Sequence, residues 1–578
     1  MLDLKITGGT IVDGTGKPRY KGDVGVRNGR IVAIGKVDGP ARQEIDARGQ
    51  IVAPGFIDVH THYDAQVFWD PTLSPSCYHG VTTIFGGFCG FSIAPLTKES
   101  GAYLMPMLAR VEGMPLESLA KGVPWNWTTF SEYLSRFEGT LAVNAGFMVG
   151  HSAVRRFVMG PRAVGEKATK EEIGKMQDLV RESIRGGALG FSTTLSITHN
   201  DADGNPVPSR HASHEEVYAL ASVVSEFEGT SVEMLPALDF SDETYEVLTQ
   251  YSLSAKRPVN WNALIMLNVT PQEKALVDRR LGATDYARAR GAEVIALTVP
   301  QTPTVRINFV SGFGLDALPG WAPLFQLNME GRKAKLKDPA YRAQLKADAA
   351  TEKGVMRMMC DWPTTKIAET FSAKTKPYEG RVIGEIAKAE NRDPFDVVID
   401  IALADDLKTS FMPQFGDEDA ELYRERAKLW TDDRTVLGAS DAGAHLDMID
   451  TFALPTAMLE SGVRKYGVIS LEAAVHQLSS KTAGLMGLKE RGELHEGWHA
   501  DIVIFDPDKV GQGKVHTRDD LPGGCARLYA DAHGISHVIV NGTEIIRDNK
   551  YLGKPAGIIL RPGKDTYTVH LPTKAAAE

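Results

Sequence analysis

Short apolar segments that alternate with helical patterns fill the middle of this 578-residue sequence, and this alternation limits the folds available to it. Residues 169–186 show the helical part of the repeating unit. Thr169 and Glu172 form a capping box at its start, apolar residues follow at helical spacing, and Gly186 ends it. Eight strands separated by such helices predict an α/β fold, a (β/α)8 barrel of the TIM type. The eight predicted strands are residues 56–60, 81–86, 141–149, 188–195, 231–235, 258–264, 294–298 and 435–440.

Both ends of the chain have a β pattern instead. Apolar residues alternate with polar ones on both sides of Asn28-Gly29, a pair typical of a type I′ hairpin. Asn541-Gly542 lies in the same pattern near the C-terminus. We expect the two ends to pair into one small β-sandwich domain. The predicted domains are residues 1–55 with 492–570 for the β-sandwich and residues 56–491 for the barrel.

The segment 299–434, between the seventh and eighth predicted strands, is too long for a single helical crossover. We interpret it as an insertion in the barrel. Its methionines and aromatic residues suit a pocket for an apolar substrate group, but they suit a separate small core beneath a long loop equally well. The residues concerned are Met356, Met358, Met359, Trp362 and Phe411.

Composition excludes several classes of protein. A net charge of −10 and a pI near 5.9 argue against a nucleic-acid-binding surface. The first residues lack the basic and apolar regions of a signal peptide, and no apolar run is long enough for a membrane span. Four cysteines in so long a chain do not form a disulfide framework. We therefore expect a cytoplasmic protein in which a cysteine is available as a ligand.

His60 and His62 follow the first predicted strand in the stretch FIDVHTHYD. Because the side chains of a strand alternate between its two faces, both imidazoles are expected to point the same way. They lie at the C-terminal end of a strand, where barrel active sites are built. The alternative is a pair of surface-loop histidines, since an H-x-H pair alone is a weak signal. The context favours metal ligands.

Two further candidates follow the second and eighth predicted strands. Cys89 lies among glycines in GGFCGF, where a thiolate is a strong zinc ligand; a small buried cysteine is the alternative. Asp441 lies in the stretch GASDAGAHLD. A carboxylate at this position can bind a metal and take a proton from an attacking water, or it can cap a helix.

The stretches APGFIDVHTH, GVTTIFGGFCGFSIAP, GHSAVR, GASDAG and RGELHEGWHADIVIFD resemble the amidohydrolase superfamily, and most closely its D-aminoacylase branch. The resemblance implies a metal-dependent barrel with a small β-sandwich, and hydrolysis of an amide by metal-bound hydroxide. It also implies that Asp441 is the catalytic base. The positions that match its metal and catalytic residues are His60, His62, Cys89 and Asp441.

The sequence departs from this family in its fifth and sixth strands, where the family supplies two histidines for a second metal. Here GTSVEMLPAL and RPVNWNALI contain none, and Glu233 or Asn262 could substitute with an oxygen ligand. We therefore expect one zinc ion rather than two. Its expected ligands are His60, His62 and Asp441, with Cys89 as fourth ligand or near neighbour.

The predicted function is hydrolysis of a carbon–nitrogen bond, in an N-acyl amino acid or a related N-acyl amide. Hydrolysis of a cyclic amide or a carbamate is one alternative, and a non-catalytic relative that kept only the fold is another. We expect a small-molecule substrate and self-association of the chain, and no nucleic-acid or membrane partner. The expected substrate-binding residues are His151, His199, Glu233, Asn262 and His445.

Overall fold

The computed structural model describes residues 1–572 except 313, 354 and 417. Two parallel sheets form its centre, and each of the eight predicted strand segments contributes to them. One has the order β6-β7-β8 and the other the order β16-β13-β12-β11-β10-β9. The third predicted strand is interrupted at Met148, so it contributes both β8 and β9. The strands are β6 (Phe56–Asp58), β7 (Val81–Gly86), β8 (Asn144–Phe147), β9 (Val149–Gly150), β10 (Gly190–Thr194), β11 (Ser231–Leu235), β12 (Val259–Leu264), β13 (Val294–Thr298) and β16 (Thr435–Leu437).

The first and last of these strands meet just beyond their C-terminal ends. Thr61 and Ala442 form a parallel bridge, and the amide of His62 donates a hydrogen bond of 2.8 Å to the carbonyl of Ala442. The amide of Asp441 in turn donates to the carbonyl of His60. These backbone bonds bring the segment after β6 beside the segment after β16.

Helices connect the parallel strands and pack against their neighbours in chain order. The hydroxyl of Thr169 accepts a hydrogen bond from the amide of Glu172, which confirms the predicted capping box. Ser213 caps the next helix through the amide of Glu216. Within the described part of the chain, no helix is both long and apolar enough to cross a membrane. The connecting helices are α4 (His151–Met159), α5 (Lys170–Arg185), α6 (His214–Val224), α7 (Asp242–Ala255) and α8 (Pro271–Arg288).

Strands from both termini pair in one nine-stranded sheet, in which β5 and β17 join the two ends of the chain in antiparallel pairing. Both predicted Asn-Gly hairpins are confirmed. Asn28 and Gly29 have φ angles of 51° and 74°, and Asn541 and Gly542 have 47° and 78°, as a type I′ turn requires. The strands of this sheet are β1 (Leu2–Ile11), β2 (Tyr20–Arg27), β3 (Arg30–Gly35), β4 (Ala41–Asp46), β5 (Ile51–Pro54), β17 (Ile502–Phe505), β22 (Ile535–Val540), β23 (Thr543–Arg547) and β24 (Lys550–Tyr551).

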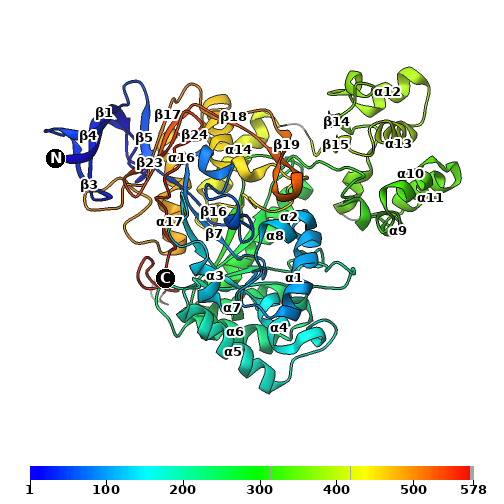
Figure 1. Cartoon of the computed structure of the whole chain (residues 1–578), viewed down its shortest axis with the longest axis horizontal. Helices are drawn as coiled ribbons and strands as arrows, with labels where there is room; N and C mark the ends of the chain where they lie inside the picture. Colours follow the sequence, from blue (N-terminus) through cyan, green and yellow to red (C-terminus); the bar gives the residue numbers. More distant parts are fainter. Residues whose placement is uncertain (313, 354, 417, 573–578) are drawn as a thin grey trace.

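The insertion between β13 and β16 has a hydrophobic core of its own and stands to one side of the parallel strands (Figure 1). Met359, Trp362 and Phe411 are buried in this core, which confirms the separate-core interpretation for these three side chains. Its described residues include β14 (Lys366–Glu369), β15 (Ser410–Met412), α9 (Ala322–Phe325), α10 (Met329–Lys337), α11 (Pro339–Ala349), α12 (Ile383–Glu390) and α13 (Pro394–Ala404).

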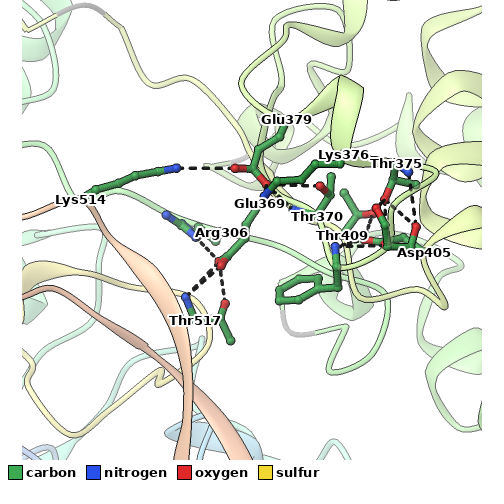
Figure 2. Close-up of polar contacts among 12 residues, drawn as sticks. Arg306, Glu369, Thr370, Thr375, Lys376, Glu379, Asp405, Thr409, Lys514 and Thr517 are labelled. Carbon is green, nitrogen blue, oxygen red and sulfur yellow. Dashed lines mark hydrogen bonds and ion pairs between the residues drawn. The ribbon is translucent and has the colours of Figure 1, made fainter.

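Charged contacts fasten this insertion to the hairpin formed by β19 (His516–Leu521) and β20 (Cys525–Tyr529) (Figure 2). Glu369, at the end of β14, accepts hydrogen bonds from the amide and the hydroxyl of Thr517 in β19. Arg306 lies 3.2 Å from the same carboxylate and donates to the carbonyl of Val515. Because Arg306 is buried, this bridge holds the base of the insertion in a defined place.

Candidate active site

His60, His62, Cys89 and Asp441 converge just beyond the C-terminal ends of β6, β7 and β16. The Nε2 atom of His62 lies 3.0 Å from Oδ1 of Asp441, and Nε2 of His60 lies 3.6 Å from the same oxygen. The Sγ atom of Cys89 lies 3.6 Å from Nε2 of His60. Zinc ligands bind at about 2.0–2.3 Å, so ligand atoms around one ion lie about 3–4 Å apart. These separations fit a single ion.

The chemistry of these donors also fits zinc, which prefers imidazole, thiolate and carboxylate. His60, His62 and Cys89 are each at most 3% exposed. Burial, and after it the negative charge of Glu233, raises the pKa of the Cys89 thiol well above its ordinary value. A bound cation offsets that cost, because it stabilises the thiolate directly.

The backbone at two of these residues is in the left-handed region. Cys89 has a φ of 54° and Asp441 a φ of 55°. Such angles are uncommon for residues other than glycine, and they cluster at functional sites where the surrounding structure imposes them. At both positions the unusual backbone directs a donor side chain toward the histidines.

Glu112, which the sequence analysis missed, lies behind His62. This buried carboxylate follows α1 (Lys98–Val111), and its Oε1 atom lies 3.4 Å from Nδ1 of His62. Burial opposes the charged form of His62, but Glu112 and Asp441 together raise its pKa to about 10. A metal ion bound at Nε2 would displace the proton there, and the proton kept on Nδ1 toward Glu112 would hold the ring in place, which is the usual way that an outer carboxylate orients a metal-binding histidine.

We expect Glu112→Gln to weaken zinc binding by about 10- to 100-fold, since the amide no longer fixes the ring of His62 through a charged acceptor. Competition with a chromophoric chelator measures the dissociation constant. Glu99→Gln is the matched control, because Glu99 is exposed on the first turn of the same helix. Equal zinc affinity of the wild type and Glu112→Gln would contradict the orienting role.

The structure brings Glu233 and Asn262 next to Cys89. The amide of Cys89 donates a 2.9 Å hydrogen bond to Oε2 of Glu233, and the other carboxylate oxygen lies 3.9 Å from Sγ. Oδ1 of Asn262 lies 3.8 Å from the same sulfur. Both side chains therefore face the metal candidates, at the places where the resembled family has histidines.

The three histidines that were predicted to bind substrate, His151, His199 and His445, differ in their surroundings. His445 lies 3.7 Å from Asp441, and the ring of His199 lies 5.0 Å from that of Phe91, two residues after Cys89. Burial, helped by the charges of His445 and His62, lowers the pKa of His199 to about 3. The ring nitrogens of His151 are instead held by Thr193 and Glu216, at 2.8 and 3.0 Å. These contacts support a bracing role for His151, with neither nitrogen left for a substrate.

Comparison with known proteins places these features in a family. A family model described as "Amidohydrolase family" matches residues 43–546, and the model of the urease alpha-subunit N-terminal domain matches residues 1–56. The D-aminoacylase of Alcaligenes xylosoxydans xylosoxydans is 27% identical over 571 residues, which cover 97% of each chain.

Two solved structures resemble the whole chain. A crystal structure of D-aminoacylase has a TM-score of 0.64 at 26% identity, covering 97% of this chain and 100% of the other. That of N-acyl-D-glutamate deacylase from Bordetella bronchiseptica, complexed with zinc and a phosphonate inhibitor, has a TM-score of 0.63 at 25% identity, covering 97% and 99%. The mixed α/β fold is thus of the type found in these enzymes.

Proposed function

Since the chain belongs to the amidohydrolase family, we propose that it is a metal-dependent hydrolase that cleaves the amide bond of an N-acyl amino acid. The observation that carries this proposal is the convergence of two buried imidazoles, a buried thiol and a partly exposed carboxylate where parallel strands end. A set of donors this costly to bury is expected where a metal ion and its chemistry need them. Because the similar enzymes are named for N-acyl-D-amino acids, we propose the D configuration for the substrate.

The proposed ion is a single zinc held by His60, His62 and Asp441, with Cys89 as fourth ligand or near neighbour. Zinc supplies Lewis acidity and lowers the pKa of a bound water toward about 7. Glu233 and Asn262 lie where a second ion would need its ligands, and an amide oxygen is a weaker donor for zinc than imidazole.

Asp441 is the proposed proton carrier. Its carboxylate takes a proton from the attacking water as the water oxygen bonds to the amide carbon, and then delivers that proton to the leaving nitrogen. The carbon–nitrogen bond breaks, and the products are a carboxylic acid and a free amine. His62, 3.0 Å from this carboxylate, stabilises its charged form.

Two features of the architecture are proposed as well. We propose that the parallel strands close into an eight-stranded barrel, which the bridge between Thr61 and Ala442 supports. We also propose that residues 1–55 and 492–570 form a separate β-sandwich domain, supported by their pairing in one sheet. Self-association and a cytoplasmic location remain predictions.

The test is an assay of amine release from zinc-loaded protein with paired D and L enantiomers of several N-acetyl amino acids. We expect hydrolysis of the D series at least about 100-fold faster than that of the L series, a ratio typical of a pocket shaped for one substrate. Equal rates would contradict the stereochemical proposal, and no amine release from any of them would contradict the substrate class.

A further inference from the structure

An N-acyl amino acid carries a carboxylate next to the amide to be cleaved, and the site described above repels such a group. Three carboxylates lie around the metal candidates, namely those of the buried Glu112 and Glu233 and of the partly exposed Asp441. Like charges at close range in a partly buried site repel one another more strongly than they do in water. The zinc ion proposed for this site carries two positive charges, which its own anionic ligands offset, so a substrate anion needs a further cation beside the site.

Arginines are present on the segments around the site, but two of them are already neutralised. Arg110, near the end of α1, lies 2.7 Å from Asp316 of the insertion. Arg306 forms its ion pair with Glu369. Arg210 differs from both, since no described carboxylate forms an ion pair with it.

Arg210 is held in place at one side of the site. It lies in a short 3-10 helix, Pro208–His211, and its Nη1 donates to the carbonyl of His199 at 2.9 Å and to Oδ1 of Asn200 at 2.7 Å. The ring of His199 contacts Phe91, which follows Cys89 by two residues. The guanidinium is thus linked to the metal candidates through one packed loop.

The remaining edge of this guanidinium has no partner in the described chain. Both hydrogen bonds of Arg210 come from Nη1, so Nε and Nη2 are left without a protein acceptor. These two nitrogens form one planar fork, which matches the two oxygens of a carboxylate. Burial lowers the pKa of Arg210, but a guanidinium stays charged in proteins.

We propose that Arg210 binds the carboxylate of the N-acyl amino acid and so determines the specificity for an anionic substrate. This inference rests on the proposed function, because it assigns a binding residue to the carboxylate of the proposed substrate. It places the recognition residue in the loop after β10, whereas the lysine that the resembled family has after its sixth strand is missing here. Asn200 and the carbonyl of His199 hold Nη1 of Arg210, and so they orient the free Nε and Nη2 atoms before a ligand binds.

Calorimetric titration of the zinc-loaded full chain with two matched ligands tests this assignment. The first is N-acetyl-D-methionine with a methylene in place of the amide nitrogen, which cannot be hydrolysed, and the second is its primary carboxamide. We expect Arg210→Gln to weaken the carboxylate ligand about 10- to 100-fold and the carboxamide less than about 2-fold, as the loss of a charged hydrogen-bonded pair implies. Arg210→Lys should restore part of the difference, since it keeps the charge without the fork.

Arg136→Gln is the control for loss of one positive charge, because Arg136 is exposed and donates only to the carbonyl of Asn126. Equal losses for both ligands, unchanged binding of the carboxylate, or no binding of it by the wild type would overturn the proposal. If the two ligands are distinguished as expected but no amide is hydrolysed, then the carboxylate site stands and the proposed reaction is wrong.

Discussion

Replacing Asp441 by asparagine is expected to lower kcat by about 10²- to 10⁴-fold, the range that a positioned general base contributes. Asparagine has nearly the same shape and keeps an oxygen for the ion, but its amide cannot take the proton of the attacking water. The loss should therefore appear mainly in kcat and only weakly in zinc content or in the midpoint of thermal unfolding. Steady-state kinetics, elemental analysis and calorimetry of the same preparation measure the three quantities.

Asp433→Asn serves as the control, because Asp433 is exposed and forms an ion pair with Arg288. Its kcat should match that of the wild type. An Asp441→Asn enzyme that keeps more than half of the wild-type kcat would show that another group carries the proton.

Replacing His60 by alanine is expected to remove both the metal and the activity. The His60 side chain is fully buried, and its Nε2 lies 3.6 Å from Asp441 and from Cys89, so it occupies the middle of the donor set. Loss of a side chain that hydrogen-bonds to a metal-binding residue already lowers metal affinity by about 10- to 100-fold. Loss of the metal-binding residue itself should lower it by at least as much. Elemental analysis should find far less than one ion per chain.

His476 offers a matched control for this substitution. It lies on α16 (Leu471–Leu478), and its Nδ1 bonds to the carbonyl of Gly14, so its role is structural. His476→Ala should reduce the unfolding temperature while the zinc content of the folded protein stays the same. A His60→Ala protein that keeps a full complement of zinc would exclude His60 as a ligand.

The sequence predicted the strand segments well because parallel strands buried on both faces leave short continuous apolar runs between helical patterns. It also identified His60, Cys89 and Asp441 as candidates, because residues that follow parallel strands gather at one edge of the sheets. Their backbone angles were not predictable. The left-handed φ of Cys89 and Asp441 is imposed by contacts between segments that lie far apart in the sequence.

The places of other residues in the site could not be predicted from the sequence. Glu112 ends a helix, and its place beside His62 depends on tertiary contacts, among them a backbone bond from His445 to the carbonyl of Glu112. Glu233 lies on a predicted strand, but alternation alone does not say which face of that strand meets Cys89. The apolar residues of the insertion fitted either a pocket or a core, since periodicity does not distinguish the two.

The most direct test of the account is to strip the wild-type protein of metal with a chelator, add zinc back in measured amounts, and follow amine release from an N-acetyl-D-amino acid. The account predicts no hydrolysis by the stripped protein and full recovery at about one zinc ion per chain, the number expected for one set of ligands. Full hydrolysis by the metal-free protein would contradict it.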